Sequence, residues 1–207
     1  MMRASYAVGV ALTTQSIPLP TQSPNPLRTK DPDMRATVST YGECDLSATM
    51  RIDAESFPDP WSIERLSHAL TGETADLRVV SNHERGVDGF AITHKYKHYI
   101  YLLRLAVDAD HRRRGAGTQL VDSIKSLLTS RGRNQIMVEV RESNLAAQLF
   151  YQSCGFLYIA TVRKFYDDNE EDAYLMEFTL PEDTRGKHRK RRLRLLDRGR
   201  DALQPKP

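Results

Sequence analysis

The sequence of 207 residues contains only two cysteines, Cys44 and Cys154. Two cysteines cannot form the disulfide framework of a small secreted domain, and no Cys or His residues have the spacing of a metal site. No apolar stretch approaches the roughly 18 residues that a membrane-spanning helix needs. These absences predict a cytoplasmic protein that needs no bound metal and has no membrane partner.

Charge is unevenly distributed along the chain, whose overall net charge is +3. Residues 181–207 contain ten Lys or Arg and four Asp or Glu, which gives this segment a net charge of +6. Residues 1–33 have a net charge of +1 and contain five prolines among many Ser and Thr, without usable periodicity. The sequence therefore predicts a disordered N-terminal extension (1–33), one folded domain (34–180) and a basic C-terminal tail (181–207).

The densest basic run of the tail extends from Lys187 to Arg194. A cationic segment of this kind binds the phosphates of nucleic acids through counterion release. The alternative is a solvated charged tail that has no partner. Contact of the tail with RNA or the ribosome is one of these two open interpretations.

Hydrophobic periodicity predicts an alternation of strands and helices between the two ends. Strands are expected at 36–41, 77–82, 88–96, 98–107, 135–140, 156–163 and 172–179, and helices at about 45–55, 61–71, 115–131 and 145–154. The early strands favour an antiparallel meander, and the later strand–helix–strand order favours a parallel pair. The pattern indicates an α/β fold, a mixed twisted sheet flanked by helices.

A glycine-containing turn connects one of these strands to a helix. An apolar run that ends at Val107 leads into Arg112-Arg-Arg-Gly-Ala-Gly117, and an apolar helical pattern follows from Leu120. Free N–H groups and the helix dipole at such a turn attract an anion, and glycine lets a phosphate approach the backbone. The turn has neither the Lys-Ser/Thr pair of a P-loop nor the third glycine of a dinucleotide-binding turn. It therefore predicts a phosphate or pyrophosphate ligand of another kind.

The hexapeptide Arg112-x-x-Gly115-x-Gly117 resembles the acyl-CoA signature of the GNAT superfamily of N-acetyltransferases. From Glu139 to Phe156 the chain reads Glu-Val-Arg-x-Ser-Asn-x-x-Ala-x-x-x-Tyr-x-x-x-Gly-Phe. This pattern is similar to the second half of the bacterial ribosomal-protein-alanine N-acetyltransferases, the RimI branch of that superfamily. Two further segments, Phe57 to Ser62 and Glu171 to Met176, also match the branch, so the resemblance covers roughly residues 36–180.

The resemblance implies the GNAT fold, in which acyl-CoA inserts between two splayed central strands. It also implies acetyl-CoA as the co-substrate. The residues that would bind it are Leu105, Ala106, Val107, Arg112, Arg113, Arg114, Gly115, Ala116, Gly117, Thr118 and Asn144. Asn144 has a second interpretation as the N-cap of the 145–154 helix, and Arg113 and Arg114 could equally be solvated surface residues.

Acetyl transfer to an amine needs a base for the amine and an acid for the departing thiolate. The resemblance assigns these roles to Glu139 and Tyr151. A carboxylate suffices as the base, because an α-amine has a pKa of about 7.7–8.0. Taken alone, Glu139 could be a solvated strand-end residue and Tyr151 a core aromatic. Cys154 is interpreted as a buried structural cysteine rather than a nucleophile.

The predicted function is Nα-acetylation of a protein, namely the N-terminal alanine of a small-subunit ribosomal protein. One alternative is a GNAT enzyme that acetylates a small amine or a lysine side chain. Another is a non-catalytic, CoA-sensing module that binds the ribosome or RNA. The chain departs from the family at Asp167, where a second aromatic residue commonly follows Tyr166. The acidic run 167–172 either favours a cationic acceptor or is a solvated turn.

Overall fold

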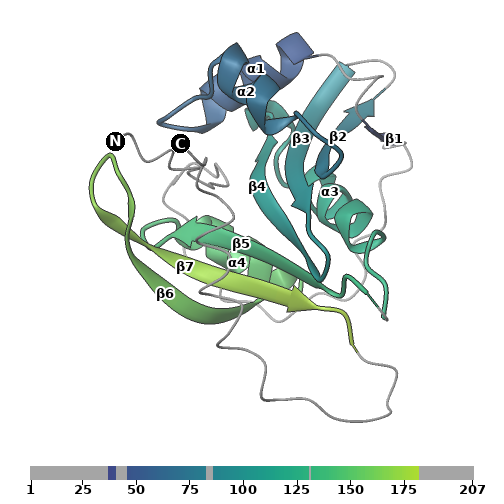
Figure 1. The fold of residues 1–207 in the computed structure, drawn as a ribbon. Coiled ribbons are helices and arrows are strands. Elements are labelled where there is room, and N and C mark those ends of the chain that lie inside the picture. Colours follow the sequence, from purple (N-terminus) through teal and green to yellow (C-terminus); the bar gives the residue numbers. More distant parts are fainter. Residues whose placement is uncertain (1–36, 41–45, 83–85, 131, 182–207) are drawn as a thin grey trace, which may run out of the picture.

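The computed structural model describes residues 37–40, 46–82, 86–130 and 132–181 (Figure 1). The predicted N-terminal extension and all but the first residue of the predicted basic tail lie outside the described residues. In the described part of the chain, no helix is long and apolar enough to cross a membrane.

Seven strands and four α-helices follow one another in the predicted order within these residues. The strands are β1 (Thr37–Thr40), β2 (Ala75–Asn82), β3 (Gly86–Lys95), β4 (Tyr99–Val107), β5 (Gln135–Arg141), β6 (Leu157–Tyr166) and β7 (Glu171–Thr179). The helices are α1 (Leu46–Ser56), α2 (Ile63–Ala69), α3 (Ala116–Lys125) and α4 (Leu145–Ser153), and a short 3₁₀ turn, η1 (Ala109–His111), precedes α3.

Helix α3 ends at Lys125, earlier than the expected residue 131. The reason is local, because two serine hydroxyls near its end bond to backbone carbonyls. Ser123 donates to the carbonyl oxygen of Leu120 at 2.7 Å, and Ser126 donates to that of Ser123 at 2.6 Å. Such bonds compete with the helical backbone pattern and favour termination.

The strands form one mixed sheet in the order β1-β2-β3-β4-β5-β7-β6. All neighbouring strands are antiparallel except β4 and β5, which are parallel. Helices α1 and α3 pack on β3 and β4 of the first half of the sheet. The mixed α/β fold predicted from the sequence is confirmed.

The two central strands β4 and β5 separate after a short pairing. Residues Tyr99–Tyr101 of β4 pair with Gln135–Met137 of β5, and no later pair joins these strands. The β3–β4 pairing continues to Val107, so β4 keeps its direction while β5 diverges (Figure 1). An additional β4 residue, Leu103, interrupts the β3–β4 register where the separation begins, and such a bulge increases local twist. The expected splay is confirmed.

A buried arginine on β4 fixes α1 and the loop that follows it. The side chain of Arg104 is fully buried, and its Nε lies 2.5 Å from Oδ1 of Asp53. A terminal nitrogen of Arg104 also donates to the carbonyl oxygen of Asp59 at 2.8 Å. The rings of Phe57 and Trp61 lie 3.7 Å and 4.8 Å from the guanidinium carbon. The α1–α2 loop is therefore held against the middle of β4.

Replacing Asp53→Asn should destabilise the protein by about 3–5 kcal/mol, because it removes the carboxylate that bonds directly to the buried Arg104 and leaves only the more distant Asp59. Urea unfolding monitored by circular dichroism measures this loss. The control is Glu55→Gln, which removes an exposed ion pair with Arg51 and should cost no more than about 1 kcal/mol. Similar losses in the two variants would show that the buried pair does not determine stability.

Candidate active site

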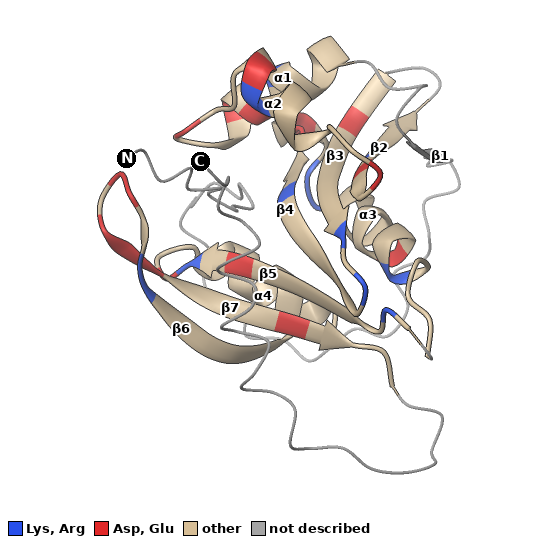
Figure 2. Cartoon of the chain, in the orientation of Figure 1, with Lys and Arg blue, Asp and Glu red and all other residues tan. Residues whose placement is uncertain are grey.

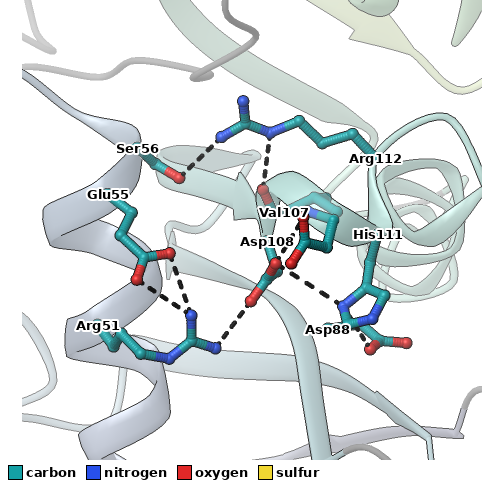
Figure 3. Close-up of polar contacts among 9 residues, drawn as sticks. Arg51, Glu55, Ser56, Asp88, Val107, Asp108, His111 and Arg112 are labelled. Carbon is teal, nitrogen blue, oxygen red and sulfur yellow. Dashed lines mark hydrogen bonds and ion pairs between the residues drawn. The ribbon is translucent and has the colours of Figure 1, made fainter.

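The connection between β4 and α3 is fixed by a network of charged groups (Figure 3). Asp108 accepts a bond from Arg51 of α1 at 2.8 Å and one from the Asp110 amide at 3.0 Å. Burial opposes ionisation of Asp108, but these bonds outweigh it, and its pKa falls below the usual value. Nδ1 of His111 lies 3.0 Å from Oδ1 of Asp88 on β3. The network places the connection firmly against α1 and β3.

The side chain of Arg112 is engaged with the protein at the start of the glycine turn. Its Nε donates to the carbonyl oxygen of Val107 at 3.0 Å, and a terminal nitrogen donates to Oγ of Ser56 at 3.3 Å (Figure 3). Its predicted part in binding a co-substrate stays a prediction. Arg113 and Arg114 are exposed, and their predicted roles stay predictions.

The turn has the geometry of an anion site. Gly115 caps α3 with a φ of +93°, and a Cβ atom added there would meet nothing within 4 Å. In the described residues no side chain caps this helix, so the amides of Ala116, Gly117 and Thr118 keep their bonding capacity for a ligand. A Cβ on Gly117 would lie 3.2 Å from Phe150, so α3 begins in close contact with α4. This open, positively polarised turn suits a pyrophosphate group.

The edge of β4 beyond the separation point is the second element of the site. Leu105, Ala106 and Val107 pair with β3 on one side, and in the described residues β5 offers them no partner on the other. Backbone groups on this edge suit an extended ligand that carries amides. Asn144 accepts a bond from the Ala147 amide at 3.0 Å, which confirms its N-cap role. Contact of these four residues with a co-substrate stays a prediction.

Glu139 lies two residues beyond Met137, the last β5 residue that pairs with β4, and so just past the point where the two strands part. Only 7% of the residue is exposed, and its Oε2 accepts a hydrogen bond from the hydroxyl of Tyr101 on β4. Burial raises the pKa of Glu139 to about 7, although the bond from Tyr101 lowers it. The alternative of a solvated strand-end glutamate is therefore wrong.

Tyr151 on α4 is completely buried. Its ring packs between those of Phe150 and Phe156, at centroid distances of 5.2 Å and 5.1 Å. Its hydroxyl has no hydrogen-bond partner in the part of the chain that the structure describes. Burial raises its pKa well above the usual value, so the hydroxyl keeps its proton at working pH. Tyr151 is thus a core residue whose protonated hydroxyl donates no hydrogen bond within the described residues.

Comparison with known proteins identifies the fold and the family. The model of the acetyltransferase (GNAT) family matches residues 46–156. The chain belongs to the GNAT family. The [ribosomal protein bS18]-alanine N-acetyltransferase of Escherichia coli strain K12 is 31% identical over 146 residues, which are 70% of this chain and 97% of that protein. The enzyme of the same name from Salmonella typhimurium strain LT2 is 33% identical over 153 residues.

A crystal structure supports the same assignment for this GNAT protein. The ribosomal-protein-S18-alanine N-acetyltransferase from Escherichia coli matches with a TM-score of 0.64 and 29% identity, over 74% of this chain and 99% of that chain. The predictions of a GNAT fold and of an acyltransferase are confirmed. In the described residues no group of three or more His, Cys, Asp or Glu could hold a metal ion. That the reaction needs no metal stays a prediction.

Sequence reasoning missed part of this GNAT site. It gave no role to Tyr101 or to the Arg104–Asp53 pair, because all three lie in segments interpreted only as regular structure. Tyr166 is buried at the end of β6, and the Arg141 guanidinium carbon lies 3.8 Å from its ring centroid. The available signal for Tyr101 was a polar hydroxyl inside an otherwise apolar strand.

Replacing Gly115→Glu should abolish acetyl-CoA binding, because a carboxylate would occupy the place of the pyrophosphate. Isothermal titration calorimetry measures the affinity. Gly72→Glu is the matched control, because Gly72 also has a positive φ, +94°, and open space around it, far along the chain from the turn. The control shares the backbone strain and the added charge but should bind normally. Equal affinities in both variants would remove the turn from the binding site.

Proposed function

We propose that this protein transfers the acetyl group of acetyl-CoA to the N-terminal α-amine of a protein, the N-terminal alanine of a ribosomal protein. The relatives that are 31% and 33% identical over nearly their full length bear that activity in their names. The observation that carries the proposal is Glu139, a buried carboxylate with a pKa of about 7 at the parting of β4 and β5. The proposed substrates imply a cytoplasmic location.

The residues of the site divide the reaction between them. Bound acetyl-CoA supplies the thioester, and the turn that starts at Arg112 would hold its pyrophosphate. Glu139 accepts a proton from the acceptor ammonium, directly or through a water. The amine nitrogen then bonds to the thioester carbon, whose oxygen a backbone N–H of β4 polarises. As the carbon–sulfur bond breaks, Tyr151 gives its proton to the thiolate, and the nitrogen releases its second proton, which restores the tyrosine and leaves a neutral amide.

The pKa of the base favours an α-amine as acceptor. An α-ammonium has a pKa of about 7.7–8.0, whereas that of a lysine side chain is about 10.4. Proton transfer to Glu139, with its pKa of about 7, is therefore uphill by about one unit from an α-ammonium and by more than three from lysine. This difference favours Nα-acetylation over the lysine alternative.

The acidic hairpin between β6 and β7 contributes less to acceptor choice than its charge suggests (Figure 2). Most of its carboxylates are paired with cations of the same half of the sheet. The pairs are Asp168–Arg141 at 2.8 Å, Glu171–Arg141 at 2.9 Å, Asp172–Arg163 at 2.5 Å and Glu170–Lys164 at 2.8 Å. Three cations therefore offset only part of the charge of the acidic run, whose ion pairs show a structural role, and a cationic acceptor does not follow from the charge alone.

A peptide with an N-terminal alanine and one internal lysine should be acetylated at its α-amine, which mass spectrometry locates. The same peptide with a blocked N-terminus should react at least about 100-fold more slowly, because only the lysine remains.

Tyr151→Phe should lower kcat about 100-fold and leave acetyl-CoA affinity unchanged. This result would show that turnover depends on the Tyr151 hydroxyl.

Two results would favour the alternatives. Equal rates for the free and blocked peptides would indicate a lysine acetyltransferase. Acetyl-CoA binding without turnover of any amine would indicate a CoA-sensing module.

We further propose that the basic tail contacts ribosomal RNA, which would raise the enzyme concentration near its acceptor. The support is the net charge of +6 in residues 181–207, beside a domain of net charge −4. Deleting residues 182–207 should leave activity on a short peptide intact and weaken co-sedimentation with ribosomal particles at low salt. Raised salt should have the same effect on the full chain. Normal co-sedimentation of the truncated protein would show that the tail is only solvated charge.

A further inference from the structure

One phenol is in direct contact with the carboxylate of Glu139, the hydroxyl of Tyr101 on β4. Tyr99 of β4 and Tyr166 of β6 interact with this carboxylate only electrostatically. Burial raises the pKa of each of these tyrosines above its usual value, so all three are neutral at working pH. No Lys, Arg or His among the described residues pairs with Glu139. Its ionised form is thus stabilised by the Tyr101 hydroxyl and by a backbone N–H, both of them neutral donors.

The charged groups nearest to this cluster serve other partners. Arg141, on the same strand as Glu139, lies over the ring of Tyr166 and forms ion pairs with the hairpin. The negative charge of Asp59, in the α1–α2 loop, helps to raise the pKa of Tyr166. Its carboxylate lies 4.0 Å from a terminal nitrogen of Arg104. Tyr151 of α4 also approaches Tyr166. None of these groups replaces the bond that Glu139 accepts from Tyr101.

The position of Tyr101 explains how its hydroxyl reaches Glu139. Tyr101 belongs to the last β4–β5 pair, opposite Met137, and Glu139 lies further along β5 where the strands have begun to part. The phenol therefore bridges the start of the gap and bonds to Oε2 of Glu139. The phenol engages Oε2 and not Oε1, so we assign Oε1 as the oxygen that accepts a proton from the amine. Hydrogen bonds to an ionised oxygen are stronger than neutral ones.

We propose that Tyr101 is a positioning residue for acetyl transfer, whose hydroxyl keeps the buried Glu139 carboxylate ionised and directs its second oxygen to the acceptor amine. The ring of Tyr101 fills the core as phenylalanine would, and only its hydroxyl serves the reaction. The proposal rests on the proposed function, because it assumes that Glu139 is the base.

Tyr101→Phe should raise the pKa of Glu139 by about one to two units, which is the effect of losing a hydrogen bond to a charged group. Carbon-13 NMR titration of the Glu139 carboxyl in the full-length protein measures this shift without any substrate. The signal is assigned by its loss in Glu139→Gln. Tyr99→Phe is the matched control, because Tyr99 stacks on Tyr96 at a centroid distance of 4.7 Å and makes no hydrogen bond to Glu139. Its titration should match that of the wild type.

The kinetic test uses the N-terminal alanine peptide at saturation. In Tyr101→Phe the acidic limb of the kcat profile should move up by the same one to two units, with a rate loss of about 10-fold or more at pH 6.5 that disappears at pH 9.5. In the Glu139→Gln background, Tyr101→Phe should have no further effect on rate. Thermal unfolding verifies that each variant is folded.

Different results separate this proposal from its alternatives. An unmoved Glu139 titration in a folded Tyr101→Phe protein overturns it, whatever the kinetics show. A rate loss that is equal at all pH values also overturns it, because Tyr101 would then transfer the proton itself. If the titration moves as expected but no peptide is acetylated, the tuning of Glu139 stands and the proposed acceptor is wrong.

Discussion

The parting of β4 from β5 is the constraint on which the site depends. A ladder that continued beyond Tyr101 and Met137 would fill the gap and satisfy the β4 edge with another strand. Because it stops there, the second half of β4, which leads into the glycine turn, and Glu139 of β5 belong to the parts of the two strands that no longer pair with each other. The bulge at Leu103 lies where the pairing ends, and an extra residue of this kind increases the local twist of the strand.

The site combines polar groups that are costly to bury. Glu139 is an ionisable residue that is buried in the protein, and the hydroxyl of Tyr151 has no hydrogen-bond partner among the described residues. An unsatisfied buried hydroxyl costs about 1–3 kcal/mol, so the fold tolerates it only because strong interactions elsewhere compensate. The pair Arg104–Asp53 is also buried, and it anchors the helix and loop that cover β4. Arg104 of β4 thus binds Asp53 of α1, whereas Tyr101 of the same strand binds the candidate base Glu139 of β5.

The sequence was sufficient to predict what depends on local order. Strand and helix positions follow from periodicity, and the turn at Gly115 and the cap at Asn144 follow from the conformations that those residues prefer. The length of the β4–β5 pairing could not be predicted, because the register of two parallel strands joined through a helix is set by packing of distant segments. The bond between Tyr101 and Glu139 depends on that register and was missed for the same reason. The side-chain partners of Arg112 were missed because Ser56 lies far away in the chain.

Among the described residues, β5 leaves the edge of β4 between Leu102 and Val107 without a paired strand, which has a consequence for the protein in the cell. Unpaired, apolar strand edges are templates on which other chains can add a strand and aggregate. A ligand that lies along this edge would occupy those backbone groups and act as a cap against such association. Metabolic supply of the acyl donor would then protect newly made molecules from precipitation as well as drive their chemistry.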